Sequence, residues 1–141
     1  MPIKYFRLKK KITINSIPVD RYIANIQIET NADLEMISEI IEKQSTMSRG
    51  DIMGVLAQLE PAIWFMLENG HPVTLGVLGT FYPAIDALSM DSPEKVTTRT
   101  IKRFRTIFKP SKYLKKRFKD VQFVLGDNKV REVRYKKKPL E

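Results

Sequence analysis

Residues 69–81 read Asn69-Gly70-His71-Pro72-Val73-Thr74-Leu75-Gly76-Val77-Leu78-Gly79-Thr80-Phe81, and the periodicity of the chain changes within them. Before Asn69, apolar residues recur at intervals of three and four, which indicates an amphipathic helix. Asn69-Gly70 is a typical left-handed helix stop. After it, β-branched residues with interspersed glycines predict a strand that turns tightly. The stretch therefore predicts an α+β fold in which a helix runs into a sheet.

Two helices are predicted upstream. The first has its cap near Thr30 or Asn31 and ends at about Gln44. The second opens at Ser48, whose hydroxyl accepts an unpaired backbone amide while Asp51 reaches back, as in a capping box.

Downstream of Phe81, residues 86–94 read as a loop or the tip of a projecting hairpin. Residues 96–109 are rich in Thr, Ile and Phe and predict a long returning strand with cations throughout. Ser111 caps a short basic helix. The order of elements is thus helix, helix, strand, arm, strand and helix.

The flanks read as β structure. Residues 1–30 predict a strand pair around a turn at residues 15–18, and residues 121–125 and 130–135 predict a hairpin around a turn at 126–129. Residues 136–138 are three lysines and read as a frayed tail. We therefore divide the chain into an N-terminal β extension (1–30), a central domain (31–119) and a C-terminal hairpin with a basic tail (120–141).

Composition excludes several functions. The 141 residues contain no Cys and one His, which excludes thiol chemistry and makes a histidine-rich metal centre or a Ser-His-Asp triad improbable. We find no catalytic constellation and expect neither a cofactor, a metal nor a small-molecule substrate. The chain has no apolar run long enough to span a membrane and no signal peptide, so we expect a cytoplasmic protein.

The net charge of +9 is unevenly distributed. Residues 31–90 carry two basic and eight acidic side chains, whereas residues 91–141 carry seventeen basic and six acidic ones. A field divided in this way orients a protein on a polyanion such as a nucleic acid.

The candidate nucleic-acid-binding residues lie on the returning strand and the last helix. Strand alternation places Arg99, Arg103 and Arg105 on one face and Lys102 on the other. On the helix, Lys112, Lys115, Lys116 and Lys119 recur at three and four and form one ridge. The alternative interpretation is a solvated surface whose cations discourage edge pairing. The full candidate set is Arg99, Lys102, Arg103, Arg105, Lys109, Lys112, Lys115 and Lys116.

Three segments resemble the bacterial histone-like family of HU and integration host factor. They are Asn69-Gly70, residues 73–81 and residues 108–116, the last reading Phe-Lys-Pro-Ser-Lys-Tyr-Leu-Lys-Lys. The second is similar to the family's Leu-x-x-Phe-Gly-x-Phe turn, with Leu78 in place of the first Phe. The third is similar to its Phe-Lys-x-Gly-Lys-x-Leu-Lys segment, with Ser111 in place of Gly. The resemblance covers residues 31–119, and a longer HU-related subgroup that starts Met-Pro-x-Lys-Tyr looks closer still.

The resemblance implies an HU/IHF-like core, an obligate dimer, and two β-arms that reach around double-stranded DNA and enter its minor groove. Residues 63–67 are apolar all around their helix, and a second chain would bury them. The rival interpretation packs Trp64 and Phe65 on the chain's own N-terminal strands. The expected dimer core is Leu56, Leu59, Ile63, Trp64, Phe81 and Phe108, and the expected structural turn residues are Gly70, Gly76 and Gly79.

The arm tip departs from the family pattern. Family arms end in an Arg-Asn-Pro tip whose proline wedges between base steps. Here the arm is shorter and the tip carries Asp86, Asp91 and Glu94, which phosphate repels, with Pro93 as the one candidate wedge.

The sequence therefore predicts a non-enzymatic, dimeric, architectural DNA-binding protein of low sequence specificity, located in the nucleoid. It binds the phosphate backbone and the minor groove. The alternative is a protein interaction module built on an HU-like fold with weakened DNA bending. RNA stays open as the nucleic acid.

Overall fold

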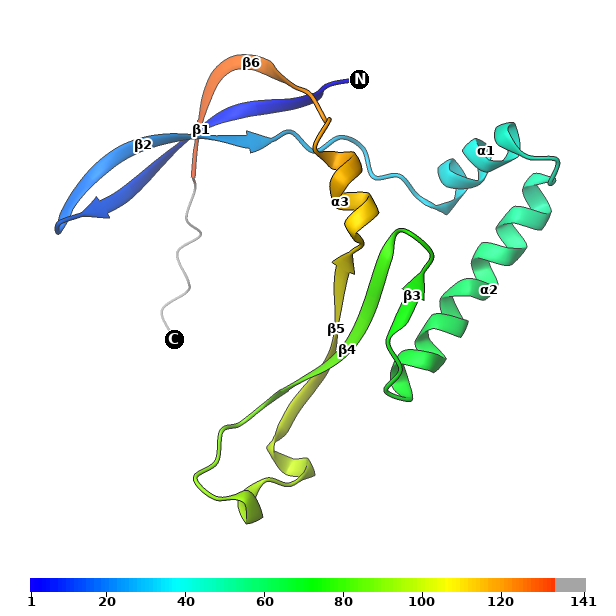
Figure 1. Cartoon of the computed structure of the whole chain (residues 1–141). Helices are drawn as coiled ribbons and strands as arrows, with labels where there is room; N and C mark the ends of the chain where they lie inside the picture. Colours follow the sequence, from blue (N-terminus) through cyan, green and yellow to red (C-terminus); the bar gives the residue numbers. More distant parts are fainter. Residues whose placement is uncertain (134–141) are drawn as a thin grey trace. The chain divides into compact units, whose positions relative to one another are not determined.

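The computed structural model describes residues 1–133, which form three α-helices and six β-strands in two compact units (Figure 1). One unit joins Met1–Thr30 to the residues from Asp120 onward, and the other spans Asn31–Lys119. The mixture of helices and strands confirms the predicted α+β class. The predicted tail at residues 136–138 and the last two residues of the predicted hairpin lie outside the described residues.

The first unit is a three-stranded sheet in the order β2-β1-β6. β1 (Ile3–Ile14) and β2 (Ile17–Ile26) are antiparallel. The two residues that join them, Asn15 and Ser16, have φ values of 50° and 65°, as a type I′ hairpin turn requires. This geometry matches the right-handed twist of the strands, and the predicted strand pair is confirmed.

The predicted C-terminal hairpin is wrong. β6 (Phe123–Glu132) is one strand that pairs in parallel with the first part of β1, Phe123 opposite Ile3 and Glu132 opposite Lys9. A local turn does form, because Asp127 Oδ1 accepts the N–H of Lys129 at 2.9 Å. However, the register slips between Tyr5 and Arg7 of β1, so residues 126–129 bulge out while the strand continues in the same direction. The two flanking runs therefore pair with β1 and not with each other.

Lys9 lies on the central strand of this sheet and pairs with both of its neighbours. Its Nζ is 3.5 Å from Oδ2 of Asp20 on β2 and 3.8 Å from Oε1 of Glu132 on β6. The attraction of these carboxylates, that of Asp20 foremost, raises the pKa of Lys9. The pair with Glu132 joins segments that are far apart in the sequence.

The second unit begins with the helix pair α1 (Leu34–Gln44) and α2 (Arg49–Glu68). The cap of α1 is Asp33, whose Oδ1 accepts the N–H of Met36 at 2.9 Å, so the cap lies two to three residues later than predicted. The predicted cap of α2 is confirmed. Ser48 Oγ accepts the N–H of Asp51 at 3.2 Å and donates to its carboxylate at 2.6 Å.

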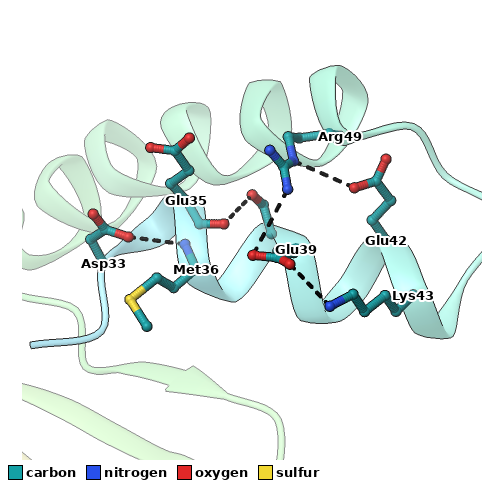
Figure 2. Close-up of polar contacts among 8 residues, drawn as sticks. Asp33, Glu35, Met36, Glu39, Glu42, Lys43 and Arg49 are labelled. Atoms are coloured by element: carbon teal, nitrogen blue, oxygen red, sulfur yellow. Dashed lines mark hydrogen bonds and ion pairs between the residues drawn. The ribbon is translucent and has the colours of Figure 1, made fainter. Parts of the chain in front are cut away.

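Ion pairs fix the junction between the helices (Figure 2). Arg49, the first residue of α2, places Nε 3.4 Å from Glu42 and Nη2 4.0 Å from Glu39 on α1. Glu39 also accepts from Lys43 Nζ at 3.0 Å. Lys43 first, and Arg49 after it, lower the pKa of Glu39.

α2 ends at the left-handed stop that Asn69-Gly70 predicted. Gly70 has φ 82°, its N–H donates to Leu67 O at 2.9 Å, and the N–H of His71 donates to Met66 O at 3.0 Å. These two bonds form a Schellman motif, which satisfies the last carbonyls of the helix.

The sheet of this unit has the order β3-β4-β5, with antiparallel pairing throughout. β3 (Val73–Leu75) turns through Gly76, at φ 50°, into β4 (Gly79–Ala87). Gly79 has φ 156°, and a Cβ there would clash with the carbonyl oxygen of Lys109 and the ring of Phe108. Glycine at this position therefore permits the close approach of β5.

β4 and β5 (Ile101–Pro110) extend together as the arm, and two 3₁₀ turns, η1 (Pro93–Lys95) and η2 (Thr98–Thr100), lie at its end (Figure 1). Two boundaries differ from the prediction. β4 continues through Asp86, which was expected in the tip, and β5 begins at Ile101 instead of residue 96. Thr100 Oγ1 donates to Thr97 O at 2.7 Å, which stabilises the turn against extension.

Few apolar side chains are buried. Among the described residues they are Ile52 and Leu67, both on α2 and 3% and 6% exposed. α2 contacts β3 and β4. Within residues 1–133 no helix has the length and apolar character that crossing a membrane requires.

Candidate nucleic-acid interface

The β4–β5 arm has two chemically different faces, because side chains alternate along each strand. Arg103 lies opposite Asp86, Arg105 opposite Ala84 and Lys109 opposite Thr80, which places all three cations on one side. We call this side the cationic face; it consists of Arg103, Arg105 and Lys109 together with Asp86.

Asp86 binds both arginines of the cationic face. Its Oδ2 accepts Arg103 Nε at 2.5 Å, and its Oδ1 accepts Arg105 Nε at 2.8 Å. The bonds from Arg103 and then Arg105 lower the pKa of Asp86. The sequence placed Asp86 at the arm tip as a charge that repels phosphate. This placement is wrong, because the carboxylate lies on β4 and is paired with the two arginines.

Lys109 occupies the end of β5 nearest the last helix. Its Nζ lies 5.1 Å from the centre of the Tyr82 ring on the same face, within the range of a cation–π contact. The aromatic ring holds the ammonium group beside the sheet, where the side chain remains exposed.

The opposite face of the arm carries Lys102 among apolar side chains. Phe104 lies across from Ile85, and Phe108 across from Phe81 with ring centroids 5.0 Å apart. Lys102 is thus separated from the cationic face, as the alternation predicted. Arg99 is an exposed residue of η2 and not of β5, so its predicted alignment with Arg103 and Arg105 is wrong.

The helix α3 (Lys112–Phe118) follows β5 directly. Its lysines are exposed, and helical spacing places Lys112, Lys115 and Lys116 on one ridge that Lys119 extends. The hydroxyl of Ser111 accepts the N–H of Leu114 at 3.1 Å and donates to the carbonyl of Val77. These bonds confirm Ser111 as the cap of the helix and tie it to the turn after β3.

An ion pair forms at the end of the arm. Asp91 Oδ1 lies 2.7 Å from Lys95 Nζ, an i,i+4 pair. Pro93 is exposed at the start of η1, where a proline needs no N–H partner.

The predicted dimer core is not buried within the second unit. Trp64 and Phe65 are 61% and 66% exposed, so the packing of α2 in its own unit does not cover them. Leu59 and Phe108 are also exposed, and the others are partly so. Helix α2 contributes Leu56, Leu59, Ile63 and Trp64, and the sheet contributes Phe81 and Phe108.

Sequence analysis missed the bonds between Asp86 and the two arginines. The sequence contained a signal for these bonds. When the strand before the arm is extended to Ala87, Asp86 lies opposite Arg103. Among residues 1–133 no three His, Cys, Asp or Glu side chains cluster in a way that would hold a metal ion.

The second unit consists of a capped helix pair followed by a small sheet with a basic two-stranded arm. This combination defines a class of α+β proteins, and comparison with known proteins identifies the family within that class. The family model HU-HIG, described as an HU domain fused to wHTH, Ig, or glycine-rich motif, matches residues 1–124. The chain belongs to this family, which confirms the HU resemblance inferred from residues 31–119. The match also includes β1 and β2.

A crystal structure of a candidate bacterial DNA-binding protein from Bacteroides vulgatus ATCC 8482 is similar to this chain, with a TM-score of 0.57 and 16% sequence identity. The alignment covers 93% of this chain and 50% of that one, so this chain spans half the length of that protein. At this identity the similarity shows a shared fold. The comparison with curated proteins gave no match.

Proposed function

We propose that this protein is a non-enzymatic, architectural DNA-binding protein that contacts the phosphate backbone of double-stranded DNA with low sequence specificity. The observation that carries the proposal is the alignment of Arg103, Arg105 and Lys109 on one side of the arm, next to the lysine ridge of α3. Guanidinium and ammonium groups on a projecting strand pair bind phosphate oxygens and release counterions. The HU-HIG family match and the fold shared with a candidate DNA-binding protein support this assignment.

The protein acts as a homodimer in this proposal, with an HU/IHF-like arrangement of its second unit. The support is the exposed apolar surface of α2, including Trp64 and Phe65, because exposed apolar patches mark protein interaction sites. A second copy would cover this surface and bring two arms to one duplex. The dimer would act in the nucleoid, with its arms along the minor groove.

The bases contribute little to recognition in this proposal. The cationic face presents its positive charges to the phosphate backbone of DNA. Pro93 alone would provide the wedge between base steps that the arm tips of the family use. Backbone contacts position a protein without reading sequence.

Fluorescence anisotropy with three labelled duplexes of unrelated sequence tests the proposal. The expected result is binding of similar affinity to all three, and equal weakening of all three by Arg103→Ala/Arg105→Ala, because phosphate contacts do not depend on sequence. Lys10→Ala/Arg21→Ala is the matched control, since it removes two cations that face each other across β1 and β2. Absence of duplex binding at low salt, or an equal loss in the control, contradicts the proposal.

The second candidate function is a protein interaction module on the same fold. The pairing of both arm arginines with Asp86 favours it, because it reduces the charge available for phosphate. A dimer that binds neither duplex DNA nor duplex RNA at low salt would support this alternative.

A further inference from the structure

Asp86 occupies an unusual position for a carboxylate on a surface assigned to phosphate binding. Its two oxygens are divided between two arginines, Oδ2 with Arg103 and Oδ1 with Arg105. The side chains of these arginines are 72% and 43% exposed, and that of Asp86 is 31% exposed. The pairing therefore lies in the open, where DNA phosphate would have to approach.

The strand register makes this position selective. Arg103 and Arg105 are two residues apart on one face, so a carboxylate directly opposite the first is diagonal to the second and reaches both. Asp91 and Glu94 follow β4 and lack this placement, and Asp91 pairs with Lys95 instead.

Carboxylate and phosphate oxygens compete for the same donors. Both are oxyanions that accept charge-assisted hydrogen bonds from guanidinium N–H groups. Two arginines and one ionised aspartate carry a net charge of +1 in place of +2. A phosphate that binds either Nε must displace a carboxylate oxygen or share the donor with it.

We propose that Asp86 is an internal competitor for DNA phosphate, which holds Arg103 and Arg105 and limits the affinity of the cationic face for duplex DNA. The inference rests on the proposed function and adds the residue that sets its strength. Because Asp86 competes for the two arginines, it weakens their contacts with the phosphate backbone of DNA. The arm therefore exchanges readily between sites on DNA.

The test compares duplex affinity and its salt dependence for the full chain, Asp86→Asn and Asp91→Asn. The Asn variant keeps the size of the side chain and removes the charge. Asp91→Asn is the matched control, because it removes one negative charge from the same arm without touching the arginines. We expect Asp86→Asn to bind about threefold to tenfold more tightly, with a salt slope steeper by about one unit, and the control to change little.

A double-mutant cycle separates competition from net charge. In the Arg103→Ala/Arg105→Ala background, Asp86→Asn is expected to have no larger effect than Asp91→Asn. The reason is that this background has no arginine left for the removal of the Asp86 charge to release. An equal gain for both Asn variants in the parent chain overturns the inference. So does weaker binding by Asp86→Asn, which would assign Asp86 a positioning role.

The failure of the inference is distinguishable from that of the proposed function. If the parent chain binds duplex DNA and Asp86→Asn shows no selective gain, the inference alone fails. If no variant, Asp86→Asn included, binds at low salt, both fail. A selective gain for Asp86→Asn over a weakly binding parent supports the inference.

Discussion

Asp86 and Gly79 show how single positions determine what the arm presents. The negative charge of Asp86 would by itself repel phosphate, yet the β4–β5 register places the carboxylate against two arginines. Gly79 carries no side chain, and its φ of 156° with the nearby carbonyl of Lys109 leaves no room for one. At both positions the neighbours across the strand pair determine the role of the residue.

The protonation of Asp86 provides a test of the triad that its carboxylate forms with Arg103 and Arg105. Hydrogen bonds from Arg103 and Arg105 lower the pKa of Asp86 in the folded protein, so the triad stabilises the fold above the ordinary aspartate pKa of about 4. This stabilisation is lost as the pH falls through the lowered pKa. NMR titration of the Asp86 carboxyl is expected to give a lower midpoint in the parent chain than in Arg103→Ala/Arg105→Ala. Equal midpoints would show that the triad is absent in solution.

Gly79→Ala is expected to destabilise the second unit by about 1–3 kcal/mol, because the added Cβ meets backbone and the φ value disfavours L-residues. Gly54→Ala is the matched control, since a Cβ there meets nothing within 4 Å and α2 gains helix propensity of about 0.5–1 kcal/mol. Urea unfolding at equal protein concentration measures both. Similar effects of the two substitutions would contradict the close approach of β5 to Gly79.

At the scale of elements, the sequence predicted what depends on local signals. Ser48 with Asp51, and Asn69-Gly70, determine the ends of α2 within a few residues of chain, and both ends formed as expected. β6 did not, because Gly126 and Asp127 give a turn signal whether the strand reverses or bulges. Its partner, β1, is more than a hundred residues away in the sequence, and only the folded sheet shows the pairing.

The candidate site follows the same rule. The lysine ridge of α3 needed only helical spacing, whereas the cationic face of the arm needed the β4–β5 register. The start of β5 at Ile101 removed Arg99 from that face. Three-residue turns such as η2 leave a weak signal in a sequence rich in threonine.

The α3 ridge is expected to contribute to DNA binding independently of the arm. Lys115→Ala/Lys116→Ala should weaken duplex binding about threefold to tenfold and flatten the salt slope by about one to two units, because two phosphate contacts are lost. The helix content measured by circular dichroism should stay unchanged, since alanine favours helices. Anisotropy equal to that of the Lys10→Ala/Arg21→Ala control would remove the ridge from the interface.

At the level of the whole molecule, the chain combines a divided charge with an exposed apolar surface. The basic segment supplies the proposed DNA contacts, and the acidic segment contains α2, whose apolar residues are largely exposed within the second unit. Both features are explained if two copies associate through α2 and present two arms.

Trp64→Glu tests that association. Analytical ultracentrifugation is expected to show a dimer for the parent chain and a shift toward monomer for the variant, because the exposed indole is replaced by a charge. Ile17→Glu, at a 63% exposed position of the β1–β2 hairpin, is the control and should leave the dimer intact. Circular dichroism verifies that the variant keeps its helices. A parent chain that sediments as a monomer would contradict the proposed dimer.

The arm is proposed to bind duplex DNA through its phosphates, and the slope of log Kd against log salt concentration reports these contacts. Phosphate binding predicts an affinity at low salt that weakens steeply as salt rises, with about 0.9 of slope for each phosphate contact. It also predicts a flatter slope for Arg103→Ala/Arg105→Ala and an unchanged one for Lys10→Ala/Arg21→Ala. Binding that is independent of salt, or a slope that the arm substitutions leave unchanged, would contradict it.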